Sequence, residues 1–329
     1  MRICLFGEFY GTLDEAMRII SFNLAKELEK NNDVLTLDLR RFATRDFWAN
    51  LMSWKPEVIH YIHGGSFKSF LLLKIAKMLT SSKTILSVMR FKELPEIVRL
   101  LRPDLLLAQS DISENYFRNL GFKTHFLPIG GVDVNRFNPK LRMRKDELRE
   151  KYKIEKDKFV ILHVGSIKKS RYIQIFKDIQ KESPENQVVI VGAISPGMEI
   201  ELFRELEKAG CIIISEYLPN IEEIYALADC YVFPVLQDDK KRNLPASIEV
   251  PLSVLEAMAC NLPVITTKFG ALPRMFKPEK GLIFINHAEE IYWAIKKVKE
   301  LEDVNNRDKV EAYSWDNVCK NLESVYSNL

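Results

Sequence analysis

Cysteine is scarce in this sequence, and the cysteines present follow no metal-binding or disulfide pattern. The 329 residues include five cysteines, none in a C-x-x-C pair, and four of them stand in apolar runs. An odd number of scattered cysteines provides neither a disulfide framework nor a thiolate zinc site. We therefore expect reduced cysteines that pack as small hydrophobic residues in a cytoplasmic protein.

Long apolar runs and a strong net charge are also missing. The longest apolar candidate, FLLLKIAKMLTSSKTILSVM, is interrupted by three lysines, whereas a transmembrane helix needs about 18 or more consecutive apolar residues. The N-terminal MRICLFGEFYG is typical of a strand and a glycine turn, not of a signal peptide. A net charge of +3 is too small to indicate nucleic acid as a partner.

The sequence does contain a regular alternation of short apolar runs with amphipathic segments of helical period. Such alternation predicts α/β structure with parallel sheets buried on both faces. The length favours two domains, and the charged stretch NPKLRMRKDELREKYKIEKDK near the midpoint indicates their boundary. We expect domains over residues 1–145 and 146–312, with a cleft between them, and an amphipathic terminal helix over 313–329. The predicted strands are RICLF, DVLTLDL, EVIHYI, TILSVM and DLLLAQ in the first half, and KFVILHVG, QVVIVGA, CIIISE, DCYVFPV, PVITT and GLIFI in the second.

A glycine followed by a basic turn ends one of these strands, in FVILHVGSIKKSR. Gly165 and Ser166 are followed by Lys168, Lys169 and Arg171, and then by a predicted helix. Helix N-terminal amides with nearby cations favour an anion such as phosphate. A plain strand exit with solvated lysines explains the same residues equally well.

One carboxylate stands inside an apolar helical stretch, Glu256 in IEVPLSVLEAMACNLPVITT. A buried carboxylate requires hydrogen-bond partners because leaving it unpaired is costly. The simpler alternative is a partly exposed glutamate favoured by the dipole near the start of its helix.

Two further loops follow strands in the first half. EVIHYIHGGSF ends a strand at His63, which at the mouth of a cleft can donate a proton to a reacting oxygen; a structural histidine is the alternative. LFGEFYG carries Gly7 and Gly11, but the spacing G-x-x-x-G does not match the G-x-G-x-x-G dinucleotide fingerprint.

Several of these segments together resemble a known family. The blocks FLPIGGVDVNRFNP, PLSVLEAMACNLPVITT, AQS at residues 108–110 and the terminal SW…VY helix occur in the order and register seen in retaining glycosyltransferases of family 4. The resemblance covers nearly the whole chain. It implies the GT-B fold, in which two Rossmann-like parallel-sheet domains face an interdomain cleft, and a terminal helix that returns to the N-terminal domain.

The resemblance also implies roles for individual residues. His63 would be the catalytic residue facing the donor sugar, and Glu256 would bind the ribose hydroxyls. Ser166 replaces the family's arginine, Arg171 falls near its lysine, and Ile248 replaces a glutamate that contacts the sugar, with Glu249 one position away. Expected donor-phosphate contacts are Gly7, Gly11, Gly165, Ser166, Lys168, Lys169, Arg171, Ser253 and Val254.

The implied function is metal-independent, retaining transfer of a sugar from a UDP-, GDP- or ADP-sugar to a hydroxyl acceptor, which in several relatives is lipid-linked. No cofactor and no metal are expected, because no acidic cluster follows a strand; Asp238 and Asp239 stand in a loop. Two alternatives remain open. A non-catalytic relative would bind a nucleotide or sugar without transfer, as Ser166 and Ile248 suggest, and another GT-B enzyme such as an epimerase would use other residues.

A basic stretch suggests a second kind of partner. Between Gly64 and Pro103 there are eight Lys or Arg residues and two acids, and SFKSFLLLKIAKML mixes apolar residues with lysines. A solvated face is the usual meaning of such a stretch. The profile also fits an interfacial helix, so we expect peripheral contact of residues 67–102 with the inner membrane face.

Overall fold

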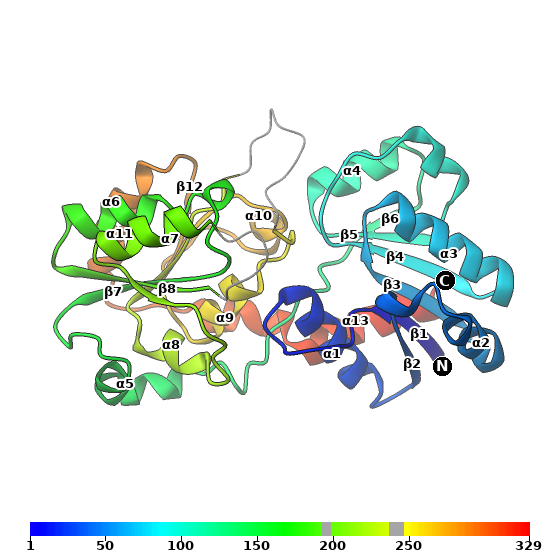
Figure 1. Ribbon diagram of the computed structural model, residues 1–329, viewed down its shortest axis with the longest axis horizontal. Coiled ribbons are helices and arrows are strands. Elements are labelled where there is room, and N and C mark those ends of the chain that lie inside the picture. Colours follow the sequence, from blue (N-terminus) through cyan, green and yellow to red (C-terminus); the bar gives the residue numbers. More distant parts are fainter. Residues whose placement is uncertain (193–198, 237–246) are drawn as a thin grey trace. The chain divides into compact units, whose positions relative to one another are not determined.

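The computed structural model describes residues 1–192, 199–236 and 247–329, which form two compact units (Figure 1). Within that part, unit 1 contains residues 1–131, 247–250 and 315–329, and unit 2 contains residues 132–236 and 251–314. Each unit is a six-stranded sheet covered by helices. The predicted α/β class is confirmed. The interdomain cleft stays a prediction.

Unit 1 is a doubly wound sheet with the strand order β2-β1-β3-β4-β5-β6, in which all neighbouring strands are parallel. Because β1 pairs with both β2 and β3, the connections diverge at β1, and such a switch point is where ligands bind in open α/β sheets. The elements are β1 (Arg2–Gly7), α1 (Ala16–Leu28), β2 (Asp33–Asp38), η1 (Leu39–Arg41), α2 (Arg45–Trp54), β3 (Val58–Gly64), α3 (Phe67–Thr80), β4 (Lys83–Val88), η2 (Glu96–Leu100), β5 (Leu105–Ala108), α4 (Asp111–Asn119), β6 (Thr124–Phe126) and α13 (Trp315–Ser327).

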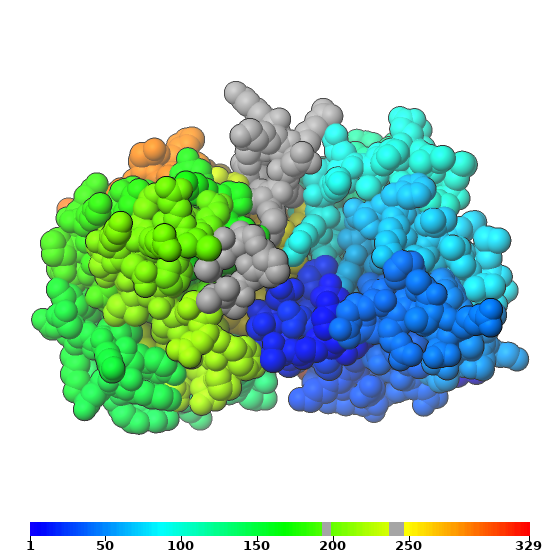
Figure 2. All heavy atoms as spheres, in the orientation of Figure 1, coloured from blue at the N-terminus to red at the C-terminus, as the bar shows by residue number. Residues whose placement is uncertain are grey.

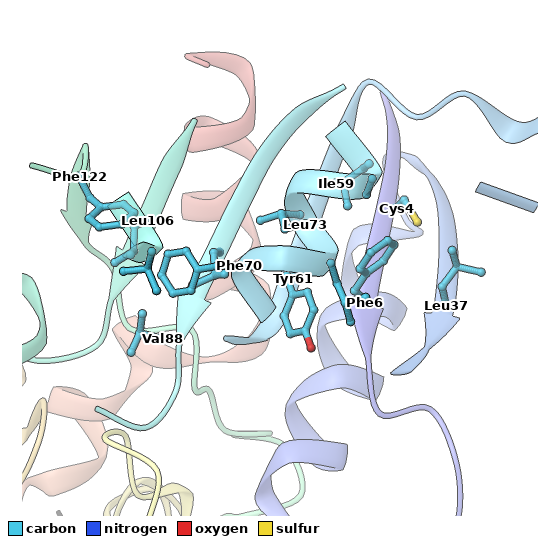
Figure 3. Packing of buried hydrophobic residues seen from close by; sticks show 14 of the residues in the cluster. Cys4, Phe6, Leu37, Ile59, Tyr61, Phe70, Leu73, Val88, Leu106 and Phe122 are labelled. Atoms are coloured by element: carbon cyan, nitrogen blue, oxygen red, sulfur yellow. The ribbon is translucent and has the colours of Figure 1, made fainter. Parts of the chain in front are cut away.

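One face of this sheet is covered by α2, α3, η2 and α4, which share a hydrophobic core with the strands. Figure 3 shows Phe70 and Leu73 of α3 among sheet residues such as Val88 and Leu106. Phe70 also makes an edge contact with Phe122 at a centroid distance of 5.5 Å. Burial of these large side chains at the spacing i, i+3 fixes the side of α3 that faces the sheet.

The terminal helix α13 belongs to unit 1, where it packs beside α1. Its buried face includes Trp315, Val318, Leu322 and Tyr326, which agrees with the predicted amphipathic helix. The Tyr326 hydroxyl lies 2.7 Å from His60 Nδ1 on β3. This hydrogen bond is buried, so the Tyr326 side chain fills the core and also satisfies a polar atom there.

Unit 2 repeats the architecture with the order β12-β11-β10-β7-β8-β9, again parallel, and its switch point lies at β7, which pairs with β8 and β10. Residues of α6, α7 and α11 form the core on one face of the sheet. The elements are η3 (Pro139–Arg144), α5 (Lys145–Lys151), β7 (Phe159–Val164), η4 (Lys169–Arg171), α6 (Ile175–Glu182), β8 (Asn186–Val191), α7 (Ile200–Lys208), β9 (Ile212–Ile214), α8 (Glu222–Leu227), β10 (Cys230–Phe233), α9 (Leu252–Ala259), β11 (Val264–Thr267), α10 (Leu272–Met275), β12 (Leu282–Ile285), α11 (Glu290–Lys299), α12 (Asn306–Val310) and η5 (Glu311–Tyr313).

The chain passes from unit 1 to unit 2 after Gly131, whereas the charged stretch predicts a boundary after residue 145. The Val132 amide donates to the Tyr313 carbonyl at 3.0 Å, and Arg307 donates to the carbonyls of Val134 and Phe137. These bonds attach the stretch after Gly131 to unit 2. A charged composition alone cannot reveal them, because each bond goes to a residue distant in sequence.

Candidate functional site

The carboxyl end of β3 places His63 at the switch point of unit 1. Its Nε2 lies 3.0 Å from Ser21 Oγ and 3.0 Å from the Met17 carbonyl oxygen, both on α1. Because that carbonyl can only accept, Nε2 carries a proton in this arrangement. The ring is therefore anchored to α1 through Nε2, and its Nδ1 is left facing Glu8.

Glu8, in the loop after β1, is a carboxylate that the sequence analysis did not single out. Its Oε1 lies 3.5 Å from His63 Nδ1, a buried atom without a hydrogen-bond partner in the described part of the chain. The His63 side chain holds the pKa of Glu8 below its usual value, although partial burial opposes this. Glu8 and His63 thus face each other at the switch point.

The two glycines of the same loop have steric roles. A Cβ at Gly7 would lie 2.7 Å from Ser21 Oγ, so glycine permits the approach of α1 that positions His63. Gly11 has a φ of +73°, which favours glycine, and a Cβ there would lie 2.9 Å from an Arg18 nitrogen. Their contact with donor phosphates stays a prediction.

The carboxyl end of β7, at the switch point of unit 2, brings Gly165 and Arg171 together. A Cβ at Gly165 would lie 3.0 Å from Arg171 Nη1 and 3.2 Å from His163 Nε2. Ser166 and Lys168 are partly buried, and Lys169 is exposed. The predicted basic turn is the short helix η4, and α6 begins at Ile175. A glycine backbone with a guanidinium against it is suited to binding an anion.

Tyr231 on β10 connects this turn with the start of α9. Its hydroxyl lies 2.7 Å from Ser253 Oγ and 3.3 Å from the Val164 carbonyl oxygen. The N-cap residue of α9, Pro251, makes no side-chain capping hydrogen bond, and the amides and dipole at this end of the helix favour negative charge. The Val254 amide already donates to the Pro251 carbonyl at 3.1 Å. Contact of Ser253 and Val254 with the donor phosphates stays a prediction.

Glu256 lies one turn further along α9 and is partly buried. The Tyr225 hydroxyl on α8 donates to its Oε2 at 2.6 Å. Burial raises the pKa of Glu256, while the Tyr225 hydrogen bond and the charge of Arg136 act in the opposite direction. Tyr225 is itself fully buried, so it fixes the carboxylate from the side of the core. Within the described part of the chain, Glu256 Oε1 accepts no hydrogen bond.

Ile248 and Glu249, the predicted donor-sugar positions, belong to unit 1 and are buried, with Glu249 0% exposed. Glu249 Oε1 accepts a hydrogen bond from Ser110 Oγ at 2.5 Å and Oε2 accepts one from Ser113 Oγ at 3.0 Å. Its amide donates to the Met89 carbonyl at 2.9 Å. The carboxylate therefore holds residues 247–250 at the N-terminus of α4, and this geometry gives no support to a sugar contact by Glu249.

The environment of Glu249 predicts a pH dependence of stability. Burial raises its pKa from 4.5 to about 7, so folding favours the protonated form. The stabilisation is full below the unfolded pKa and is lost as the pH rises through 7, by up to about 3 kcal/mol. Glu249→Gln should flatten the decline of the thermal midpoint between pH 5 and 8, whereas Glu96→Gln, at an exposed position, should leave it unchanged. An unaltered decline in Glu249→Gln would contradict this assignment.

The described part of the chain lacks a metal-binding group and a membrane-spanning helix. It contains no group of three or more His, Cys, Asp or Glu residues that could hold a metal ion, and no helix there is long and apolar enough to cross a bilayer. Asp238 and Asp239 lie outside the described residues.

Solved structures of other proteins identify the fold. Sucrose-phosphate synthase from Thermosynechococcus elongatus aligns with a TM-score of 0.79 at 15% identity, covering 100% of this chain and 98% of that one. Anabaena HepE, solved in complex with UDP, aligns with a TM-score of 0.76 at 14% identity over 100% of both chains. The fold is GT-B, as predicted.

The family follows from the sequence. The chain belongs to the family described as glycosyl transferases group 1, whose model matches residues 144–315. D-inositol 3-phosphate glycosyltransferase from Paenarthrobacter aurescens is 24% identical over 56% of this chain and 47% of its own length. Sulfoquinovosyl transferase SQD2 from Arabidopsis thaliana is 24% identical over 56% of this chain and 36% of its own. The matched region thus spans less than half of these two relatives.

Proposed function

We propose that this protein transfers a sugar from a nucleotide-diphosphate sugar to a hydroxyl acceptor, with retention at the anomeric carbon and without a metal ion. The observation that carries the proposal is the Glu256 carboxylate, fixed through one oxygen by the buried Tyr225. A carboxylate held in this way can accept two hydrogen bonds from adjacent hydroxyls, as the ribose of a nucleotide offers. In this proposal Glu256 selects the nucleotide.

The diphosphate would bind between the turn after β7 and the N-terminus of α9, which Tyr231 ties together. Arg171, Lys168 and Lys169 supply positive charge, and backbone amides at the start of α9 supply hydrogen-bond donors. These groups would stabilise the charge that builds on the phosphate as its bond to the sugar breaks. This is the role that a metal ion has in other transferases, and it supports the metal-independent form of the proposal.

In the proposed reaction, the bond between the anomeric carbon and the phosphate oxygen breaks and the acceptor oxygen bonds to the same face of the sugar. The acceptor proton leaves with the nucleoside diphosphate. His63, whose Nδ1 faces Glu8, is the proposed catalytic group that polarises the sugar. A cytoplasmic location is proposed with it, since all five cysteines are free and buried.

A donor screen tests this proposal. HepE has been solved with UDP-glucose, so UDP-glucose is the first candidate, followed by GDP- and ADP-sugars. At 100 times its Kd, a true donor should stabilise the protein by about 2.7 kcal/mol, and the thermal midpoint should rise. Release of nucleotide with a panel of hydroxyl acceptors would then demonstrate transfer. If none of the nucleotides raises the midpoint, the donor site is wrong. Binding without transfer or hydrolysis would instead favour the non-catalytic alternative.

A further inference from the structure

Exposed apolar side chains gather on one part of unit 1. Of the 16 large hydrophobic residues that are exposed in the described structure, seven fall between residues 67 and 100. Five of them follow one side of α3, and the other two lie on η2. We call these seven residues the apolar face: Phe67, Leu71, Ile75, Met78 and Leu79 of α3, and Ile97 and Leu100 of η2.

The two parts of the apolar face lie on the same side of the sheet. Phe70 and Leu73 of α3 and Val98 of η2 enter one hydrophobic core, so the exposed residues of both elements point away from it. Lys77 Nζ lies 2.5 Å from Asp104 Oδ1, which places the end of α3 beside the segment that follows η2. In Figure 2 the stretch coloured from light blue to cyan is at the surface of unit 1.

The stretch that carries the apolar face has a net positive charge, whereas the rest of the chain has a net negative charge. Residues 64–103 carry eight Lys or Arg residues and two acids, a net charge of +6, and since the whole chain is +3, all other residues together are −3. Lys83, Arg90, Lys92 and Arg102 are exposed. Polyanions without apolar character, such as nucleic acids, would leave the apolar face in water. An anionic lipid bilayer offers acyl chains to the apolar face and negative charge to the cations.

We propose that the apolar face and the exposed cations of residues 64–103 dock unit 1 onto an anionic lipid bilayer. Phe67 and Leu79 are 12 residues apart, so the exposed side of α3 is about 18 Å long. Lying along the bilayer surface, it would place its apolar side chains at the boundary of the acyl chains, with lysines and arginines at the level of the headgroups. Met78 and Leu100, both 74% exposed, would enter deepest. The proposal does not depend on the donor chemistry of unit 2.

Vesicle co-sedimentation with the full chain and without nucleotide tests the docking. We expect a partition coefficient at least about tenfold higher for vesicles of phosphatidylcholine with phosphatidylglycerol than for phosphatidylcholine alone, falling as salt is added. The double variant Met78→Asp, Leu100→Asp should lose about tenfold or more of the binding. Lys92→Gln with Arg102→Gln should weaken binding to the anionic vesicles alone.

Met143→Asp is the matched control, because Met143 is 85% exposed but lies in unit 2. It should bind vesicles as the wild type does. Circular dichroism establishes that each variant is folded. Equal partition into both vesicle types, or full binding by the double variant, would overturn the proposal. A dimer that light scattering detects in the wild type but not in the double variant would also overturn the proposal. The apolar face would then contact a second copy of the chain.

Discussion

Replacing Glu256 with glutamine should lower the affinity for the donor nucleotide by about tenfold to a hundredfold. Hydrogen bonds to a charged acceptor contribute about 1.5–3 kcal/mol each, and the amide keeps the shape of the side chain while losing the charge and one acceptor. The fold should persist, because glutamine can still accept the Tyr225 hydroxyl through its Oε1. Isothermal titration calorimetry with the donor found in the screen measures the loss, and the thermal midpoint without nucleotide measures the fold.

Glu223→Gln is the control for this experiment. Glu223 lies on α8, close in sequence to Tyr225, and its carboxylate is largely buried and paired with Lys151 and Tyr152. Its replacement should leave nucleotide affinity unchanged. If Glu256→Gln binds the donor as the wild type does, Glu256 does not bind the ribose. If the variant unfolds, its role is structural.

The pH profile separates a positioning role of Tyr225 from simple packing. Burial raises the pKa of Glu256 and the Tyr225 hydroxyl opposes the rise. In Tyr225→Phe the pKa should therefore rise further, so the carboxylate becomes protonated at a higher pH. The acid limb of the affinity profile should shift upward in pH in Tyr225→Phe and disappear in Glu256→Gln. A uniform loss of affinity at every pH would point to packing alone.

The predicted strands correspond to observed strands because a buried parallel strand leaves a continuous apolar run in the sequence. Strand β6 leaves no such apolar run, because it has three residues, lies at the sheet edge and contains no buried residue. The sequence also indicated a position that requires an unusual backbone conformation. Gly165, expected to end a strand, has a φ of +155° and leaves room for Arg171.

The partners of the site residues could not be read in the same way. Tyr225 and Tyr231 stand in apolar patterns that predict only burial, and the direction of a hydroxyl leaves no trace in periodicity. Glu249 was noticed by its position near Ile248, but its partner Ser110 is 139 residues away. Glu8 is a single acid in a loop, and only the fold brings it to His63. Sequence spacing locates these residues, whereas tertiary contacts decide what they hold.

The largest stability effect is expected from Arg149, in the charged stretch that the sequence presented as a boundary. Its side chain is buried and donates to the carbonyls of Leu227, Lys156 and Lys158 and to Asp229 Oδ2 at 2.6 Å. Asp229 also accepts the amide of Val160 at 2.7 Å, so Arg149 links α5 to β7 and to the start of β10. Arg149→Met should destabilise unit 2 by about 3–5 kcal/mol, because three carbonyls lose their donor and Asp229 keeps only Lys145 as a cationic partner.

Hydrogen exchange can show where stability is lost, because the opening of a cooperative unit exposes the amides of that unit first. Amides of β7 and β10 should lose protection in Arg149→Met, while those of β1 and β3 in unit 1 should keep theirs. Arg144→Met is the matched control: Arg144 is exposed and pairs with Glu147 within the same stretch, so its protection pattern should equal that of the wild type. Equal patterns in the two variants would mean that Arg149 adds no more than a surface charge. A loss of amide protection confined to unit 2 would show that a charged stretch stabilises a domain when one of its residues is buried. Composition alone cannot distinguish such a stretch from a linker.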